Sequence, residues 1–229
     1  MALNRKNVRV MIDEIIRSGR KSIAIEVKPG GRVIVRAPAG ISLNRIDEIV
    51  SRRREWIIAK QKEIAEKAPP PRTYARDEEF WFMGKKYPLN IIKDEKYAFR
   101  FDGRGFIMSE ECRPYGESCF ALWYKEQARH ILPGRTYGFA RKYGFKPAKV
   151  KISSADTRWG SCSTRGNINY SWKLILLPVP LIDYVIIHEL AHLIEHNHSR
   201  DFWAIVEKIY PDYKKARKWI KEKGGMYAP

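Results

Sequence analysis

The feature that most constrains this chain is a run of fourteen residues, 185–198, which holds four of its five histidines. His188 and His192 are four residues apart, so on an α-helix their side chains leave one face, a turn apart. This spacing lets two imidazole nitrogens bind a single zinc ion at about 2.0–2.1 Å. Glu189 can then reach a metal-bound water without binding the metal itself, which suits a general base. The run therefore predicts a hydrolytic zinc site on an apolar helix.

A His-Glu-x-x-His match is only moderately specific, because a single histidine on an apolar helix is usually an ordinary core residue. Here two histidines and a carboxylate interrupt an aliphatic stretch. Burying such polar groups without partners costs about 2–7 kcal/mol each. Coordination to a shared metal ion removes that cost, so the sequence favours a metal site over plain core packing.

The third ligand is expected to be His198. If the helix continued, His196 would lie about 12 Å along its axis from His188, too far for one ion. His198 would face the opposite side of such a helix, so it reaches the metal only if the helix ends near Asn197. Asparagine tolerates the left-handed conformation that often ends helices. His196 is then either exposed or placed to support the ligands.

Composition indicates a globular protein of a reducing compartment. The chain has 229 residues, of which 44% are hydrophobic and 12% aromatic. Its three cysteines have no C-x-x-C spacing, which argues against a disulfide framework or a zinc ribbon. The N-terminus has no apolar signal region, and the longest apolar run, 174–182, is far too short to cross a membrane. We expect a cytoplasmic protein.

The second strong signal is a net charge of +18. It raises the prospect of a polyanionic partner, such as a nucleotide, nucleic acid or the ribosome. Many basic residues nevertheless only solvate helix faces. The triplet Arg52, Arg53 and Arg54 is therefore interpreted first as a solvated face, with a phosphate-contacting patch as the functional alternative.

Hydrophobic periodicity predicts an N-terminal region, residues 1–72, and a catalytic domain, residues 73–229. The first contains a β-hairpin, 21–27 with 32–36, a long helix from Ser42 to about Ile64, and a proline-rich connector at 68–71. The second begins with a small antiparallel sheet of strands near 80–83, 87–92, 97–101 and 105–108. Helices are expected at 117–132 and 135–143, separated by Pro133.

The remaining segments build the expected site. A strand at 150–153 and a hairpin strand at 168–173 precede the histidine helix, which Pro178 and Pro180 begin. Asp183 is expected in its first turn, where negative charge is favourable. Ser199 is typical of the start of a further helix, and the C-terminal segment is interpreted as two helices broken at Pro211.

Three motifs in a fixed order carry a resemblance to a known family. They are RWGSCS at 158–163, INYSWKL at 168–174 and DYVIIHELAHL at 183–193, followed by Asn-His-Ser at 197–199 and Phe-Trp at 202–203. Together they resemble the YgjP-like metal-dependent hydrolases, a zincin-like family related to the SprT-like and WLM metalloproteases. The resemblance extends over roughly residues 18–225. It implies an α+β zincin-like fold with Glu189 as the catalytic residue and three metal ligands: His188, His192 and His198.

The expected activity is a zinc-dependent hydrolase of metallopeptidase type, in which Glu189 deprotonates a metal-activated water that attacks an amide bond. The strand at 168–173 could offer its edge to an extended peptide. Further candidates for contacts with the substrate or with the ligands are Arg158, Asn169 and His196.

Two alternatives stay open. The same chemistry directed at phosphorus would give a metal-dependent nucleoside-triphosphate pyrophosphohydrolase, with Arg158 as a candidate phosphate contact. A non-catalytic zinc domain that binds nucleic acid is the other alternative. Structural zinc sites usually have four protein ligands, and Cys162 as a fourth ligand is disfavoured because it would exclude the catalytic water.

Overall fold

The protein is described from a computed structural model that defines residues 10–67, 72–93, 98–155 and 157–227. The chain divides into two compact units, Met1–Pro70 and Pro71–Pro229, and both mix helices with strands. This is the α+β class that the sequence predicts. The expected connector at 68–71 lies outside the described residues. Independent folding of two domains, with a boundary at residue 72, stays a prediction.

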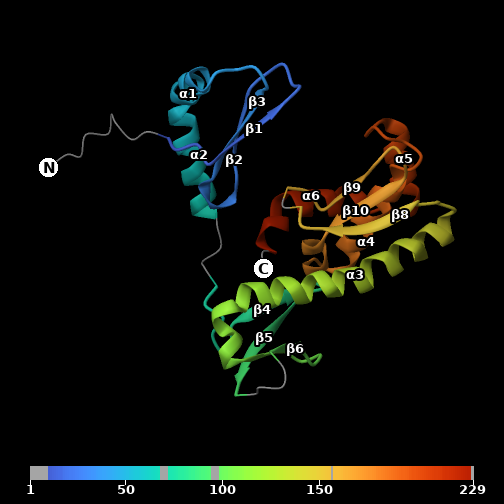
Figure 1. The fold of residues 1–229 in the computed structure, drawn as a ribbon. Helices are drawn as coiled ribbons and strands as arrows, with labels where there is room; N and C mark the ends of the chain where they lie inside the picture. Colours follow the sequence, from blue (N-terminus) through green and yellow to red (C-terminus); the bar gives the residue numbers. More distant parts are fainter. Residues whose placement is uncertain (1–9, 68–71, 94–97, 156, 228–229) are drawn as a thin grey trace. The chain divides into compact units, whose positions relative to one another are not determined.

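The N-terminal unit is a three-stranded sheet covered by two helical segments (Figure 1). Its strands are β1 (Glu14–Ser18), β2 (Ala24–Val27) and β3 (Val33–Pro38), in the order β1-β3-β2. β2 and β3 pair in antiparallel fashion where the sequence predicts a hairpin, and a turn at Pro29–Gly31 joins them. β1 runs parallel to β3 and was not anticipated. The core of this unit consists of Val33, Val35, Ala37, Ile46, Val50 and Ile57.

The expected single long helix is two segments, α1 (Leu43–Arg52) and α2 (Arg54–Lys67). Ser42 caps α1 through its side chain, which accepts a hydrogen bond from the Arg45 amide. At Arg53 the backbone leaves helical geometry, with φ −99° and ψ 7°. Its amide bonds to the carbonyls of both Ile49 and Val50, so the hydrogen-bond pattern tightens there before the helix resumes.

The C-terminal unit opens with a four-stranded sheet of order β4-β5-β7-β6. Its strands are β4 (Glu79–Phe82), β5 (Lys85–Ile92), β6 (Phe99–Phe101) and β7 (Phe106–Ser109). The prediction of a purely antiparallel sheet was wrong, because β5 and β7 are parallel. Among the described strands, β6 lies at the edge of the sheet and pairs only with β7. β7 follows β6 in the chain but lies between β5 and β6 in the sheet. Tyr97, which was expected in β6, lies outside the described residues.

One helix, α3 (Gly116–Tyr143), spans the region where two helices were expected. Pro133 removes one backbone donor but does not end the helix. The helix continues because its apolar face stays buried on both sides of the proline, at Ala128, Leu132 and Ala140. Figure 1 shows α3 running between the two sheets of the C-terminal unit. Burial of one long face therefore outweighs the local helix-breaking signal.

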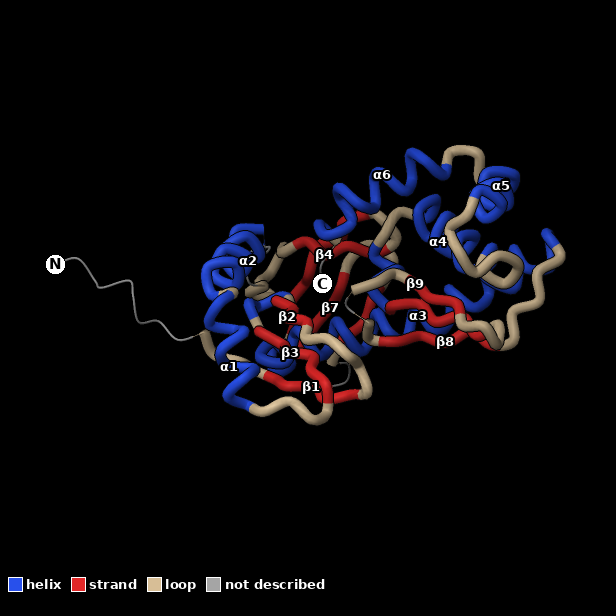
Figure 2. The backbone as a smooth tube through the Cα atoms, turned by 90° about the horizontal axis from the view of Figure 1, so that it is seen from above, coloured by secondary structure: helices blue, strands red, loops and turns tan. Residues whose placement is uncertain are grey.

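The second sheet and three further helices complete this unit. The strands β8 (Lys149–Ser153), β9 (Gly160–Cys162) and β10 (Asn167–Ser171) have the order β8-β10-β9. The helices are α4 (Val179–Ala191), α5 (Arg200–Ile209) and α6 (Tyr213–Lys223), and Figure 2 shows them together at one end of the unit. Cys112, Cys119 and Cys162 are free thiols. Within the described ranges, no helix has the length and apolarity needed to cross a bilayer.

An ion pair ties α3 to α4. The Arg135 guanidinium donates two hydrogen bonds to the Asp183 carboxylate, from Nε at 2.8 Å and from Nη2 at 2.7 Å. Asp183 lies one residue beyond the first turn of α4, so its role is this cross-helix pair. Bidentate geometry of this kind is stronger than a single-point contact. The pair fixes the helix that carries the histidines against the longest helix of the unit.

We expect Arg135→Met to lower the free energy of unfolding by about 1–3 kcal/mol, because Asp183 keeps its half-buried charge and loses its partner. Urea denaturation monitored by circular dichroism measures the change. Arg129→Met on the same helix is the matched control. Arg129 pairs with the exposed Glu126, and such surface pairs contribute about 0–1 kcal/mol. Equal losses in both variants would contradict the structural role of the pair.

Candidate metal centre

Helix α4 carries His188 and Glu189 in its last turn, next to His192. The helix is nearly all apolar, begins directly after Pro178, and is otherwise buried in the core. It ends at Ala191, with His192 as its C-cap. The expectation that it runs to Asn197 was therefore wrong, and Asn197 does not adopt a left-handed conformation.

Two short-range hydrogen bonds mark the early end of α4. The Leu193 amide bonds to the Leu190 carbonyl at 3.0 Å, and the Ile194 amide bonds to the Ala191 carbonyl at 3.0 Å. Such i to i−3 bonds tighten the last turn and lead the chain off the helix axis. The chain therefore turns back before His198, and Ser199 starts α5 by accepting a hydrogen bond from the Phe202 amide at 3.2 Å.

Three imidazoles converge at this turn. Their candidate ligand atoms, one each from His188, His192 and His198, all lie within 4.8 Å of one another. The Nε2 atoms of His188 and His198 are 3.0 Å apart. Two nitrogens bound to one tetrahedral zinc ion at about 2.0–2.1 Å would lie about 3.3–3.4 Å apart. The arrangement could hold one metal ion with little movement of the side chains.

Hydrogen bonding around the imidazoles also suits a metal. His192 Nδ1 lies 3.0 Å from the Glu195 carbonyl oxygen, which can only accept, so Nδ1 carries the proton. The lone pair of His192 is thereby on Nε2, as in metal-bound histidines that donate their other ring nitrogen to a carbonyl. Within this cluster, two buried atoms of the described residues have no hydrogen-bond partner, His188 Nδ1 and Glu189 Oε2. The unpartnered carboxylate oxygen of Glu189 beside three converging imidazoles fits a bound cation and its water.

Aromatic side chains of α5 and α6 support the imidazoles. The Phe202 ring lies 4.5 Å from the His192 ring, and the Trp203 ring stacks on His198 at 5.6 Å. Tyr213 stacks on Trp203 at 5.1 Å, and the Arg217 guanidinium carbon lies 4.7 Å from the Trp203 ring centre. The C-terminal helices thus fix the orientation of His198, which has no regular secondary structure of its own.

The surroundings favour the neutral form of His188 and of His198. Burial, together with the neighbouring His192 and His198, lowers the pKa of His188 to about 3. Burial also lowers the pKa of His198, with His192 and the Arg217 cation acting in the same direction. Only the neutral imidazole has a free lone pair for a metal. At neutral pH both side chains are therefore in the form that a metal ligand requires.

Glu189 is the one buried carboxylate of this cluster, and its side chain approaches the backbone of β9. It is 5% exposed. Burial raises its pKa to about 8, while the charge of Arg158 acts in the opposite direction. A β-carbon added at Gly160 would lie 2.6 Å from Glu189 Oε1 and 2.7 Å from Cγ. Glu189 can occupy this position only because residue 160 has no side chain.

A cavity of about 350 Å³ lies in front of the imidazoles. The β9 strand forms one wall, and the other lining residues are Thr164, His188, Glu189, His192, His196 and His198. His196 is exposed and lines this cavity without joining the three converging imidazoles. Asn169 pairs across the sheet with Ser161 and is not among the lining residues. Arg158 is exposed, close enough to Glu189 for its charge to affect that carboxyl.

The strand that was expected to bind a peptide by its edge has no free edge. The segment 168–173 was expected to offer a free strand edge, but β10 is the central strand, with β8 on one side and β9 on the other. The backbone N–H and C=O groups of β10 pair with the strands on both sides. The strand that borders the cavity at the edge of this sheet is β9.

Sequence reasoning missed several residues that shape the site. Gly160 and Trp203 stand within the quoted motifs, but the approach of Glu189 to Gly160 and the stacking of Trp203 on His198 were not anticipated, nor was any role of Arg217. The spacing of Tyr213 and Arg217 places them four residues apart on one helix face, but no sequence signal indicates that this face meets Trp203. Only the packing of α6 against α5 reveals that contact.

The family can now be identified. The sequence model described as "YgjP-like, metallopeptidase domain" matches residues 21–223. The chain belongs to the YgjP-like family. The resemblance inferred from the motifs is confirmed, and membership makes this YgjP-like chain a metal-dependent hydrolase.

Two other comparisons add little to this. Among curated proteins, none matches the sequence. The crystal structure of the metallopeptidase zymogen of Pyrococcus abyssi abylysin is similar over 41% of this chain and 94% of that chain, with 26% identity and a TM-score of 0.38. A TM-score this low does not indicate a shared arrangement of elements, so the fold and the site stand on the geometry of the YgjP-like chain itself.

We expect Gly160→Ala to destabilise the protein by about 1–3 kcal/mol, because the new methyl group must displace the buried Glu189 carboxyl. Thermal and urea unfolding measure the change. Gly134→Ala is the matched control: it lies inside α3, and nothing stands within 4 Å of an added β-carbon. That change should stabilise the protein by about 0.5–1 kcal/mol through better helix propensity. A neutral Gly160→Ala would mean that Glu189 does not hold the described position.

Proposed function

We propose that this chain is a zinc-dependent peptidase in which His188, His192 and His198 hold the metal and Glu189 is the general base. The observation that carries the proposal is the convergence of three imidazole nitrogens within 4.8 Å beside a buried carboxylate. Three imidazoles are a donor set that suits zinc, and a site with three protein ligands leaves a position open for substrate or water. That openness distinguishes a catalytic centre from a structural one.

A bound zinc ion supplies Lewis acidity, which polarises a carbonyl group and lowers the pKa of water. The protein residues supply the proton transfer. Glu189, whose pKa burial raises to about 8, is suited to take a proton from the attacking water and return it to the leaving nitrogen. A cation in the site would lower that pKa towards neutrality, where a group that both accepts and donates a proton works best.

The proposed substrate is an extended peptide that lies along β9. This strand borders the cavity and is at the edge of its sheet, so its outer backbone groups can pair with a substrate strand. Such pairing would place a scissile amide in front of the imidazoles without requiring a specific side chain. Arg158, exposed and close to Glu189, is proposed as a contact for the polar groups of the substrate.

We expect the purified protein to bind one zinc ion per chain. Alanine at His188, His192 or His198 should lower the affinity by more than the roughly 10–100-fold that loss of a supporting hydrogen bond costs. Equilibrium dialysis against zinc with a competing chelator measures it.

Two other histidines are the controls for zinc binding. The first is His196→Ala, in the same cavity, and the second is His130→Ala, exposed on α3. Both should leave the zinc affinity within about threefold of that of the unaltered protein, because neither histidine belongs to the three converging imidazoles. If His196→Ala loses zinc as completely as His198→Ala, the proposed ligand set is wrong.

We expect Glu189→Gln to keep zinc and to lower kcat/KM for peptide hydrolysis by about 10²–10⁴-fold, the usual contribution of a general base. A panel of quenched fluorescent peptides, with zinc content measured on the same samples, tests this. Glu195→Gln is the matched control, because the backbone carbonyl of that residue holds His192 and its side chain does not.

The same assay separates the peptide proposal from the nucleotide alternative, for which the net charge of +18 and the exposed Arg158 are the motivation. Nucleoside triphosphates are incubated in parallel, with release of pyrophosphate and phosphate as the readout. Triphosphate turnover that Glu189→Gln abolishes, together with uncut peptides, would refute the peptidase proposal in favour of a pyrophosphohydrolase.

A further inference from the structure

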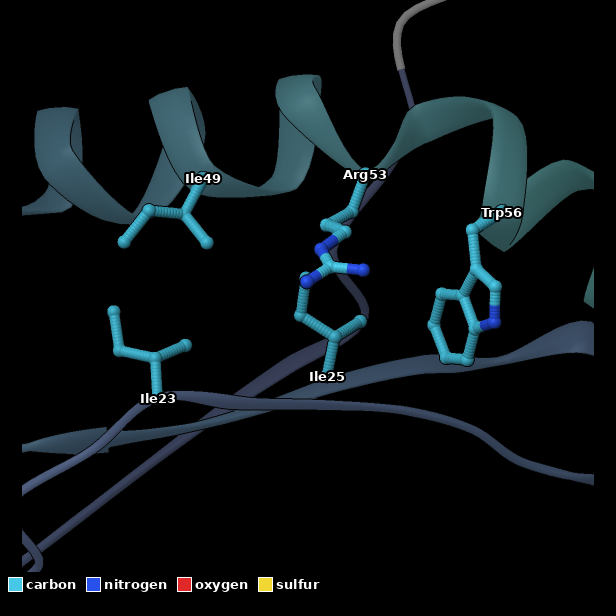
Figure 3. Close-up of a pocket in the computed structure, with 5 residues that line it drawn as sticks. All are labelled: Ile23, Ile25, Ile49, Arg53 and Trp56. Carbon is cyan, nitrogen blue, oxygen red and sulfur yellow. The ribbon is translucent and has the colours of Figure 1, made fainter.

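The N-terminal unit contains a pocket that belongs to no part of the metal centre. Figure 3 shows Ile49, Arg53 and Trp56 pointing from the helices towards Ile23 and Ile25 on the sheet below. These five residues line a space of about 240 Å³. That is smaller than the roughly 300–1,000 Å³ of a typical small-molecule site and is of the scale of one large side chain.

The helical wall of the pocket is a second apolar stripe beside the one that forms the core. Ile46, Val50 and Ile57 are fully or almost fully buried against the sheet. Ile49 of α1, Arg53 at the break and Trp56 of α2 all point to the same side, towards the sheet (Figure 3). Trp56 remains 46% exposed. An exposed tryptophan beside isoleucines is an apolar surface that folding of the described unit does not cover.

Arg53 gives this apolar pocket a single positive charge. Its two neighbours are engaged elsewhere: Arg52 pairs with Glu48 at 2.5 Å, and Arg54 is half-buried. No described carboxylate lies within ion-pair distance of Arg53, and Figure 3 shows its guanidinium extending into the pocket towards Ile25. Of the three arginines, which were interpreted first as a solvated face, Arg52 and Arg53 are exposed and Arg54 is half-buried, and Arg53 lines the pocket.

The strand below the pocket is an edge. In the sheet order β1-β3-β2, β2 pairs with β3 alone among the described strands. Ile25 of β2 and Ile23, which directly precedes the strand, both line the pocket. Glu26 faces the other side, where Lys28 and Arg36 bind it at 2.7 Å each. No acidic group of β2 therefore neutralises Arg53.

From these observations we propose that the pocket binds the carboxyl-terminal residue of an extended peptide. The peptide adds as a strand to the free edge of β2, its last side chain enters between Ile25, Ile49 and Trp56, and its terminal carboxylate pairs with Arg53. Strand addition gives affinity through backbone hydrogen bonds, and a pocket for one side chain gives selectivity. The proposed site is independent of the metal centre and of its activity.

A nucleic acid fits the pocket less well. Its bases carry hydrogen-bonding groups at their edges, and against isoleucine walls these groups would lose water without gaining partners. Binding of a phosphate backbone usually draws on several cations, whereas one arginine faces this pocket. An apolar side chain next to a single carboxylate matches both the walls and the charge.

The test uses the full-length protein carrying Glu189→Gln, so that no peptide is cut during the measurement. The probes are fluorescein-labelled hexapeptides of the form Lys-Thr-Val-Thr-Val-X, with X as valine, leucine, phenylalanine or tryptophan. Each is made with a free carboxyl terminus and with an amide. Fluorescence anisotropy gives the dissociation constants. At least one free acid should bind saturably below about 1 mM, and about tenfold more tightly than its amide, as a charge-assisted hydrogen bond predicts.

Variants then locate the binding. Arg53→Gln should abolish the difference between acid and amide, and Trp56→Ala should weaken both forms. Arg52→Gln is the matched control, since Arg52 is paired outside the pocket, and it should leave both constants unchanged. Circular dichroism melts check that these exposed substitutions leave the fold intact.

Four results would overturn the proposal. They are no saturable binding by any free acid, equal affinity of acid and amide, an Arg52→Gln loss as large as that of Arg53→Gln, or binding of single-stranded oligouridylate that depends on Arg53 and Trp56 and excludes the peptides. The last result would reassign the pocket to nucleic acid.

Discussion

The return of His198 to within 3.0 Å of His188 is the contact on which the candidate site depends. It requires α4 to end at Ala191 and the chain to reverse over a few residues without a left-handed residue. A loop this short cannot hold an imidazole in place alone. Trp203 and Phe202 of α5 pack on the imidazole rings, and Arg217 of α6 lies over Trp203. The C-terminal helices are thus part of the candidate metal centre although they supply none of the three converging imidazoles.

A second constraint is the space made for Glu189. A carboxyl group that is 5% exposed is costly to bury, and it is tolerated where its polarity has a use. Gly160 leaves the room that it needs, and β9, which carries this glycine, also forms the wall of the cavity. One short strand therefore serves both the proposed general base and the proposed substrate. This coupling explains why the proposed peptide path follows β9 and why β10, the central strand, is not available.

The N-terminal unit shows how far a charge run in sequence differs from a charged surface. Arg52, Arg53 and Arg54 are consecutive, yet Arg52 ends α1, Arg54 begins α2 and Arg53 lies at the break between them. Arg52 is paired with Glu48, Arg54 is half-buried, and Arg53 faces an apolar pocket. The three like charges therefore lie in three environments. The functional proposal for this unit accordingly concerns one carboxylate rather than a polyanion.

Local patterns in the sequence determined the helix of the histidines, the Ser199 start of α5, the β2–β3 pairing and the family, because spacing along one element is set by backbone geometry. The early end of α4 was not predictable, because the apolar pattern of the helix continues through Leu193 and Ile194. Nor were the continuity of α3 through Pro133 and the parallel pairing of β5 with β7. Tertiary structure decided these, together with the contacts of Gly160 and Trp203, because burial of apolar surface between distant segments outweighs local preference.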